Sequence, residues 1–478
     1  MANNDIYEVV IGLEVHVELA TETKIFCGCP TTFGAAPNTQ CCPVCMGMPG
    51  TLPVLNEKVV EYAARAGIAT HCTLTTRGRQ DRKNYFYPDL PKAYQISQSQ
   101  LPIAEHGYLD IQVEGNTRRI GITRIHIEED AGKLVHDGGE GTLIDYNRCG
   151  VPLIEIVSEP DLRSAEEVKA YLQKLRAMVM YLGVSSGKMN EGAFRCDVNL
   201  SIRKHGETAF GTRTEMKNLN SFAFIAKAIE SETARQIKVI ESGGQVTQET
   251  RRWDAAKGVS AAMRSKEDAH DYRYFPDPDL MPIIIDDEMQ ASLRASMPLL
   301  PDDYIDQYTK QYGIKPEVAD ALVSDKAVAE YFESVVKEVK DADMLANFMM
   351  TEVKRLMASG EEESAIGMSV HQLASLINLA SSEKINLSIA KKVADKIWNT
   401  DILPKDYIDS EDLWPIVDRT VLEAFADQVL TQNPRILSDY LGGKTQAFGA
   451  YMGQMMRLTK GKADPGVSEQ IFMDRIQK

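Results

Sequence analysis

The hydrophobic period of the sequence changes near residue 290, and this change constrains the fold more than any other feature. Before it, short segments alternate apolar and polar residues with period two and are broken by Gly and Pro, as in strands. From Pro298 onward, helical spacing replaces the alternation. We therefore expect an α+β fold, with a mixed or antiparallel sheet domain at 1–292, an all-helical domain at 293–405 and a small helical tail domain at 406–478.

Three helices are expected to lie between the strands and to cover the sheet, at about 56–66, 165–182 and 221–241. Ser164, with Glu167 three residues later, is expected to cap the second of these helices, and Gly183 is expected to end it. Beyond residue 298, helical spacing predicts helices at 326–340, 343–358, 370–381, 386–399, 410–429 and 434–441.

Length and charge exclude several classes of protein. A chain of 478 residues exceeds one typical core, and it has no apolar run near the roughly 18 residues that a membrane span needs. Its N-terminus has no secretory signal pattern, so we expect a cytoplasmic protein. The net charge of -16 argues against a generally basic nucleic-acid-coating protein. Residues 431–478 nevertheless carry seven Lys and Arg against four acids, which fits either an RNA-contacting tail or a solvated face.

Three strand-like segments carry polar residues that alternate with apolar ones. In VVIGLEVHVEL, Glu14 and His16 share one face, which can hold a cation or can simply face solvent. The segment RRIGITRIHIEEDAGK contains Glu129, and Glu155 lies inside the apolar segment GVPLIEIVSEPDL. A buried carboxylate needs a partner, which is either Mg²⁺ that also holds phosphates or an arginine such as Arg124 or Arg148.

Other polar segments could grip a nucleotide. Asp197 and Arg203 in RCDVNLSIR, with Lys217 in EMKNLNSF, could form the floor of a polar cavity or a solvated surface. In RGRQDRKNYFYPDLPKAYQISQSQ, basic and aromatic residues interleave, among them Arg82, Lys83, Tyr85 and Lys92. Such a mixture can stack on a base and neutralise phosphates, or its aromatic turns can pack on the core. The chain has no GxxxxGK[ST] loop, so any ATP site is not a P-loop.

The sharpest local signal is a pair of cysteine pairs, Cys27 with Cys29 and, twelve residues later, Cys42 with Cys45. Four cysteines on two short turns favour a tetrahedral zinc site over a set of free thiols. Cys41 could replace Cys42 as a ligand. A closed four-cysteine site leaves no position for substrate, so its role would be structural. The residues alone indicate a metal-dependent enzyme that acts on phosphates or carboxylates.

Seven strings narrow this interpretation, and they occur in order along nearly the whole chain: IGLEVHVEL, DRKNYFYPDLPKAYQISQ, GITRIHIEEDAGK, VPLIEIVSEPDL, RCDVNLSIR, EMKNLNSF and HDYRYFPDPDL. With them the chain resembles the B-subunit family of the aspartyl/glutamyl-tRNA amidotransferases, in its bacterial type. The resemblance implies an N-terminal cradle domain with kinase and transamidase chemistry, a helical domain and a tRNA-contacting tail.

The resemblance also implies an activity and partners. In that family a heterotrimer of an amidase (A) subunit, the B subunit and a small C subunit converts Glu-tRNA(Gln) or Asp-tRNA(Asn) to Gln-tRNA(Gln) or Asn-tRNA(Asn). The B subunit uses ATP and Mg²⁺ to phosphorylate the carboxylate, and channelled ammonia from glutamine displaces the phosphate, so the enzyme is a carbon–nitrogen ligase. Two alternatives remain open: a stand-alone metal-dependent ligase or kinase for a free amino acid, and a non-catalytic zinc-stabilised RNA-binding scaffold.

Residue by residue, Glu14, His16, Glu129 and Glu155 match the metal-binding positions of the family, and Glu129 also lies near the end of the ammonia path. Lys92 matches a residue at the outlet of that path. The catalytic role expected for Asp197 follows only from its polar strand. Cys27, Cys29, Cys42 and Cys45 match a zinc site that some members of the family have.

Overall fold

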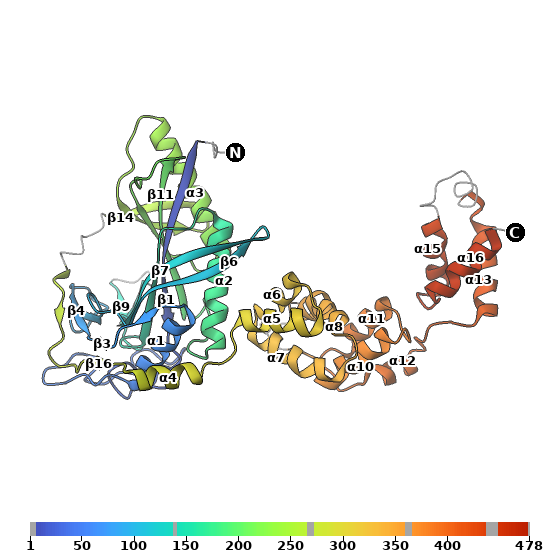
Figure 1. The fold of residues 1–478 in the computed structure, drawn as a ribbon, viewed down its shortest axis with the longest axis horizontal. Coiled ribbons are helices and arrows are strands. Elements are labelled where there is room, and N and C mark those ends of the chain that lie inside the picture. The colour runs from blue at the N-terminus through green and yellow to red at the C-terminus, as the bar shows by residue number, and fades with distance from the viewer. Residues whose placement is uncertain (1–5, 137–140, 265–271, 359–365, 436–447, 477–478) are drawn as a thin grey trace. The chain divides into compact units, whose positions relative to one another are not determined.

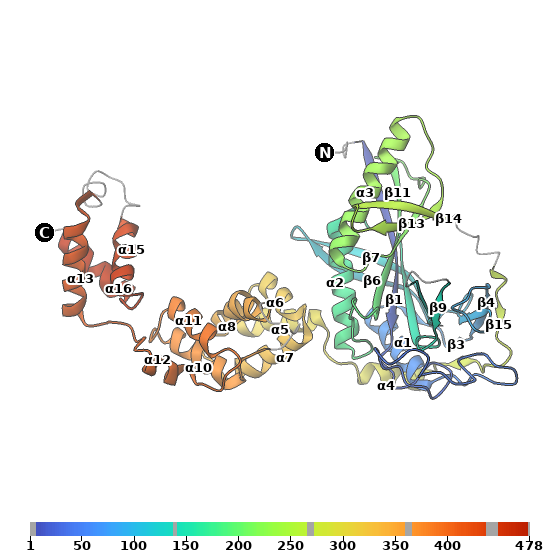
Figure 2. The same cartoon turned by 180° about the vertical axis from the view of Figure 1, so that it is seen from behind.

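The computed structural model describes residues 6–136, 141–264, 272–358, 366–435 and 448–476. The chain divides into two compact units, Met1–Pro301 and Asp302–Lys478. Unit 1 has sheets and helices, whereas the described residues of unit 2 form helices, so the expected α+β class is confirmed (Figures 1 and 2). The domain boundaries expected at 292 and 405 stay predictions.

Unit 1 is built on a nine-stranded sheet with the order β14-β13-β12-β11-β1-β10-β7-β6-β2. Neighbouring strands run antiparallel except for the parallel pair β12 and β13, so the sheet is mixed. Its strands are β1 (Tyr7–Glu18), β2 (Thr73–Leu74), β6 (Ala104–Val113), β7 (Asn116–Glu129), β10 (Pro152–Ser158), β11 (Phe194–Lys204), β12 (Thr214–Lys217), β13 (Glu249–Asp254) and β14 (Val259–Arg264).

Three small sheets complete unit 1, with the orders β15-β4-β5, β16-β3 and β8-β9. Their strands are β3 (Arg77–Gly78), β4 (Asp81–Asn84), β5 (Tyr94–Ser97), β8 (Lys133–Val135), β9 (Leu143–Asp145), β15 (Phe275–Pro276) and β16 (Ile283–Ile284). The pairing of β15 with β4 brings segments almost 200 residues apart in sequence into contact.

The apolar face of the large sheet is covered by helices, as expected. α1 (Glu57–Ala69), α2 (Ala165–Tyr181) and α3 (Phe222–Glu241) contact β7, β6 and β11, and their apolar residues join the strand residues in one core. A fourth helix, α4 (Asp287–Ala295), contacts α1. The Ser164 hydroxyl accepts a hydrogen bond from the backbone N–H of Glu167 at 3.1 Å, and a cap of this kind stabilises a helix by about 1 kcal/mol.

The described residues of unit 2 form helices joined by turns and loops, with one isolated bridge between Ile416 and Ala463. Its helices are α5 (Pro301–Tyr312), α6 (Pro316–Val323), α7 (Lys326–Val335), α8 (Ala342–Phe348), α9 (Lys354–Ala358), α10 (Val370–Ser381), α11 (Leu387–Ile397), α12 (Pro404–Ser410), α13 (Arg419–Gln432), α15 (Phe448–Leu458) and α16 (Pro465–Ile476). α13, α15 and α16 share a separate small core that includes Tyr451 and Phe472. None of the helices in the described ranges is both long enough and apolar enough to cross a membrane.

The extent predicted for one helix in this unit is wrong. The expected helix at 410–429 is two helices, because α12 ends at Ser410 and α13 begins only at Arg419. Pro415 lies between them and has no backbone N–H to continue a helix. The carboxylate of Asp418 then caps α13 by accepting hydrogen bonds from the N–H groups of Thr420 and Val421. The helix expected at 434–441 falls mostly outside the described residues.

Candidate functional site

The register of the strands around β1 gathers polar side chains on the face of the sheet opposite the helices. On β1, His16 lies between Glu155 of β10 and Arg195 of β11, and Glu155 in turn pairs with His126 of β7. Glu14 lies opposite Asp197 of β11. Because side chains alternate between the faces of a strand, these paired residues lie on one face.

The first cluster on this face is the histidine–glutamate group, which comprises His16, His126, Glu128 and Glu155. The Nε2 atom of His16 lies 3.3 Å from Glu155 and 3.7 Å from Glu128, and that of His126 lies 3.4 Å from each carboxylate. The four side chains are between 5% and 20% exposed. The partners of these two carboxylates are therefore histidines, and Arg148 pairs instead with Asp130.

The electrostatics of this group favour full ionisation in the absence of another cation. Burial by itself lowers the pKa of His16, but the hydrogen bond and charge of Glu155, with Glu128 and Asp197, raise it to about 9. Burial likewise lowers the pKa of His126, and the same two glutamates raise it to about 9. Burial raises the pKa of Glu155, yet the two imidazoles lower it well below its usual value. Two imidazolium and two carboxylate groups thus balance each other's charge.

The donor set of the histidine–glutamate group fits a divalent cation. Ligand atoms of His16, Glu128 and Glu155 all lie within 4.8 Å of one another. Neighbouring ligands of an octahedral ion at about 2.1 Å lie about 3 Å apart, so these side chains need only small movements to converge. Oxygen donors favour a hard ion, and one neutral imidazole is compatible with it.

A second cluster, the acidic group, lies beside the first on the same face and comprises Glu14, Asp197 and Glu215. Its carboxylates also lie within 4.8 Å of one another. The Lys217 ammonium lies 2.7 Å from Asp197 and 3.4 Å from Glu215, and the Asn199 amide donates to Glu14 at 2.9 Å. A cavity of about 300 Å³ opens next to the group, and its lining includes Gly12, Glu14, Ser158, Asn199, Phe210 and Arg213. Glu14 and Arg213 are the charged side chains in its lining.

Glu129 points away from both groups and forms a buried pair with Lys92. The ammonium lies 2.5 and 2.6 Å from the two carboxylate oxygens, and the N–H of Ile96 donates to one of them at 2.9 Å. Gly47 approaches Lys92 so closely that any side chain there would clash with it. The structure therefore brings His16 and Glu155 together, whereas Glu14 lies in the acidic group and Glu129 lies with Lys92.

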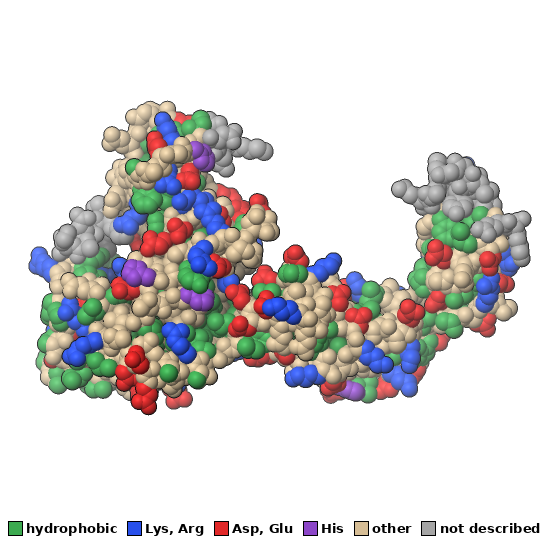
Figure 3. All heavy atoms as spheres, viewed as in Figure 1, with side chains coloured by type: hydrophobic (Ala, Val, Ile, Leu, Met, Phe, Trp, Pro, Cys, Tyr) green, Lys and Arg blue, Asp and Glu red, His purple; other side chains and the backbone are tan. Residues whose placement is uncertain are grey.

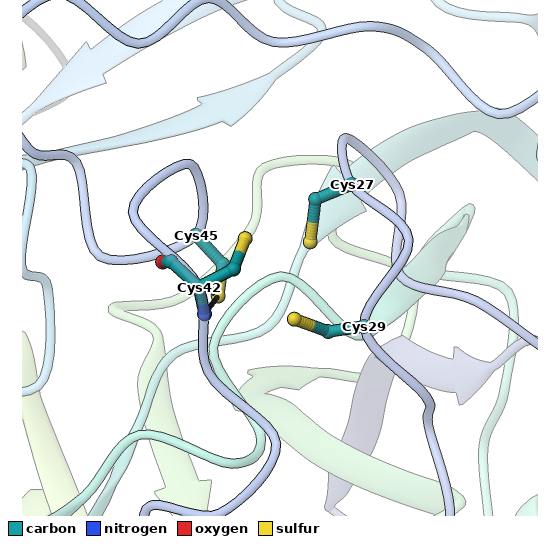
Figure 4. A group of neighbouring side chains, drawn as sticks. All are labelled: Cys27, Cys29, Cys42 and Cys45. Atoms are coloured by element: carbon teal, nitrogen blue, oxygen red, sulfur yellow. Dashed lines mark hydrogen bonds between the residues drawn. The ribbon is translucent and has the colours of Figure 1, made fainter.

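The cysteine group comprises Cys27, Cys29, Cys42 and Cys45, whose sulfur atoms point toward one another from two loops (Figure 4). The four Sγ atoms lie within 4.8 Å of one another, and tetrahedral zinc with bonds of about 2.3 Å requires about 3.8 Å. The fourth member is Cys42, since Cys41 instead contacts Asn147 at 3.8 Å. The donor set and its compactness fit zinc.

Hydrogen bonds and a nearby positive charge favour the thiolate form at Cys45. The thiol of Cys27 and the N–H of Cys42 donate hydrogen bonds to Cys45, and with the nearby Lys24 charge they lower the pKa of Cys45 to about 4. Burial, with hydrogen bonding to Cys42, raises the pKa of Cys29 to about 11.

The loops around the group also expose large apolar side chains, namely Phe33, Met48, Leu52 and Val54. Apolar side chains are prominent on this face of unit 1 in Figure 3.

The residues expected to bind a nucleotide are not all gathered in one place. Arg82 lies 2.7 Å from Asp277 and 2.9 Å from Asp279, and it stacks on Tyr94, so its guanidinium holds β15 against β4. Arg203 lies 2.6 Å from Glu8 and over the ring of Phe210, which lines the 300 Å³ cavity.

Lys83 lies nearer to the histidine–glutamate group. Its ammonium lies 4.8 Å from the ring centre of Tyr272 and 5.7 Å from that of Tyr85. Burial lowers the pKa of Lys83, but the charge of Glu128 and the neighbouring tyrosines raise it above the usual value. Burial also raises the pKa of Tyr85 to about 12. A lysine held cationic in this place can attract a phosphate.

Sequence reasoning had missed His126 and Glu128 as site residues. The signal was present, since period two along β7 puts Arg124, His126 and Glu128 on one face and Glu129 on the other. The cavity residue Phe210 follows β11 in a loop and had no comparable periodic signal, whereas Arg213 was expected from the sequence to line a polar cavity.

Comparison with known proteins gives the family. The sequence model of the GatB/GatE catalytic domain matches residues 9–291, and the model of the GatB domain matches residues 330–476. The chain belongs to the GatB/GatE family. The histidine–glutamate group, the acidic group and the cysteine group all fall within the range matched by the GatB/GatE catalytic domain.

Relatives within the GatB/GatE family match over the full length. The B subunit of the aspartyl/glutamyl-tRNA(Asn/Gln) amidotransferase from Caldicellulosiruptor saccharolyticus is 54% identical over 477 residues, which cover 99% of each chain. The protein of the same name from Geobacter sulfurreducens is 50% identical over 476 residues, covering 98% of this chain and 99% of the relative. The expected family resemblance is thereby confirmed.

Proposed function

We propose that the chain is the B subunit of a glutamine-dependent tRNA amidotransferase, which activates the side-chain carboxylate of Glu-tRNA(Gln) or Asp-tRNA(Asn) and amidates it. The observation that carries the proposal is the cluster of ionised histidines and carboxylates on the polar sheet face of a chain from this family. In the first step the carboxylate oxygen attacks the γ-phosphorus of ATP and ADP leaves. In the second, ammonia attacks the acyl carbon and phosphate leaves.

The polar face supplies what the first step requires. His16, Glu128 and Glu155 would hold a divalent ion, with Glu14, Asp197 and Glu215 beside them. Mg²⁺ bound there would neutralise charge on the phosphoryl group as it transfers. Lys83 and Lys217 extend into the same region and would attract the phosphates. Arg203 would act at the edge of the 300 Å³ cavity, and Arg82 would hold the Tyr85 segment in place through its two aspartates.

Lys92 and Glu129 would serve the second step. A cavity of about 100 Å³ is lined by both residues and by Phe26, Tyr94 and Gly150. Ammonia that enters as ammonium must lose a proton before it can attack an acyl phosphate. Glu129 can accept that proton, and the Lys92 ammonium holds its carboxylate in place at 2.5 Å.

The partners and cofactors follow from the same proposal. An amidase subunit would supply ammonia from glutamine, and a small third subunit would complete a cytoplasmic heterotrimer. ATP and Mg²⁺ would act on the polar face, and the cysteine group would hold a structural zinc. The tail helices α13, α15 and α16 would contact the tRNA.

The decisive experiment is amide formation on Glu-tRNA(Gln) and Asp-tRNA(Asn) by this chain co-purified with its amidase and small subunits. We expect product only when glutamine, ATP and Mg²⁺ are all present. Amidation of free glutamate or aspartate without the partner subunits would favour a stand-alone ligase. Tight tRNA binding with no product from the assembled complex would favour an RNA-binding scaffold.

A further inference from the structure

The side chain of Lys24 is fully buried, although lysine is among the residues least often found inside proteins. It lies in the loop that leads from β1 to Cys27, and its backbone N–H donates to the carbonyl of Cys29 at 2.9 Å. Its stem passes beside Gly150, where an added side chain would lie 3.6 Å from the Lys24 Cδ atom. The side chain is therefore enclosed by the protein along its length.

The ammonium of Lys24 faces sulfur. Its Nζ atom lies 3.8 Å from the Sγ atom of Cys45 and 3.4 Å from the backbone carbonyl oxygen of Tyr146. Its charge also acts on the thiols of Cys41 and Cys149. Of the two close contacts of the ammonium, only the Cys45 sulfur can carry a full negative charge, because a carbonyl oxygen offers only a partial one.

The nearby carboxylates already have partners. Glu129 and Asp279 line the same cavity as Lys24, but Glu129 lies 2.5 Å from Lys92, and Asp279 lies 2.9 Å from Arg82. Within the described ranges, no carboxylate lies within 4.0 Å of the Lys24 ammonium. A buried ammonium without a counter-ion is costly, and the Cys45 sulfur at 3.8 Å is the group among the described residues that is placed to supply one.

We propose that Lys24 is the counter-ion of the cysteine group and a positioning residue for its metal. This inference rests on the proposed metal site of the cysteine group. Four thiolates around a divalent zinc ion leave two negative charges, and the Lys24 ammonium cancels one of them. The same contact holds the Cys45 sulfur in the orientation that the metal requires.

The proposal couples Lys24 to metal binding in both directions. Metal-bound thiolates stabilise the ammonium, and the ammonium stabilises the metal-bound thiolates. In the metal-free chain the Lys24 ammonium faces the Cys45 sulfur alone, so it stabilises that form less than it stabilises a centre of four metal-bound thiolates. A lysine that merely packs in the core would instead contribute equally to both forms.

The test compares the full-length chain with Lys24→Met, which keeps the bulk but removes the charge, and with Lys24→Gln, which can still donate to the Tyr146 carbonyl. Lys354→Met is the matched control, because Lys354 is a partly buried lysine that donates to the Ala321 carbonyl in unit 2, where the sequence has no cysteine. Zinc affinity is measured by competition with a chromophoric chelator, and thermal midpoints are measured with zinc and after its removal.

We expect both Lys24 variants to bind zinc at least roughly tenfold more weakly than the wild-type chain, and Lys354→Met to bind it as the wild type does. We also expect zinc to raise the thermal midpoint of Lys24→Met less than that of the wild type. Unchanged affinity, or an equal loss of midpoint in the loaded and metal-free forms, would overturn the counter-ion role alone. A wild-type chain that binds no zinc would overturn the metal site as well. Neither result depends on amidation.

Discussion

The cysteine group and the histidine–glutamate group are both candidate metal sites, but they are assembled in opposite ways. The cysteines lie within nineteen residues of sequence, on two short loops. The histidines and glutamates come from β1, β7 and β10, and His16 on β1 is more than a hundred positions from the other three. A local site is specified by spacing, whereas a site across strands is specified by register. A single shift in register would destroy the second and leave the first intact.

The largest effect is expected at the cysteine group, where Cys41 and Cys42 provide a matched pair. Cys42→Ser should abolish zinc binding and lower the thermal midpoint by several degrees, because the metal stabilises only the folded chain. Cys41→Ser should keep one zinc per chain, since Cys41 lies outside the group. Metal analysis of the purified variants checks this. Loss of zinc in both variants, or in neither, would contradict the assigned ligand set.

A smaller effect, on the affinity for a divalent ion, is expected at Glu128 and Glu129, which lie on opposite faces of β7. Glu128→Gln should weaken Mn²⁺ binding, with Mn²⁺ as a spectroscopic substitute for Mg²⁺, by roughly thirtyfold, because the variant removes a charged ligand. Glu129→Gln should leave Mn²⁺ affinity within about threefold, because Glu129 pairs with Lys92. Titration followed by electron paramagnetic resonance measures both affinities. The reverse order would assign the metal to the Glu129 side.

The smallest effect is expected on the free energy of unfolding, which should depend on pH through the two histidines of the histidine–glutamate group. The folded pKa of His16 and that of His126 are about 9, above the unfolded value of about 6.5. Their stabilisation is therefore fully present below pH 6.5 and is lost as the pH rises through 9. In the metal-free chain, His126→Gln should be less stable than the wild type at pH 6.5 by about 1 to 3 kcal/mol, and this gap should close by pH 10.

Urea unfolding of metal-free wild type and His126→Gln between pH 6.5 and 10 measures that gap directly. Because the cysteines titrate in both proteins, their contribution cancels in the difference. The exposed His71→Gln serves as the control. A gap that stays constant with pH would mean that the imidazoles are not held as cations by Glu128 and Glu155.

The sequence was sufficient for features whose partners are close in sequence. The Ser164 cap and Gly183 gave the bounds of α2 to within a residue, and cysteine spacing gave a group that the folded chain brings together. Alternation along β1 correctly placed Glu14 and His16 on one face. In each case the physical constraint acts over a few residues, as a hydrogen bond to a helix end or as the pleat of one strand.

The features that sequence could not supply depend on distant partners. Arg82 lies in a basic and aromatic segment that is typical of phosphate binding. Its guanidinium is instead held by two aspartates that lie almost 200 residues later in the sequence. The acidic group forms because β12 joins the sheet next to β11, which no local pattern reveals. The break between α12 and α13 was overlooked, although it has a local signal in Pro415, which has no backbone N–H to continue a helix.

The most direct test of the proposed activity is the Glu155→Ala variant in the assembled complex with its amidase and small subunits. Glu155 contacts both histidines of the group, so its loss should lower amidation of Glu-tRNA(Gln) by about a thousandfold, while tRNA affinity stays within about threefold. The exposed Glu230→Ala on α3 should retain full activity. Unchanged turnover in Glu155→Ala would contradict the role of the histidine–glutamate group.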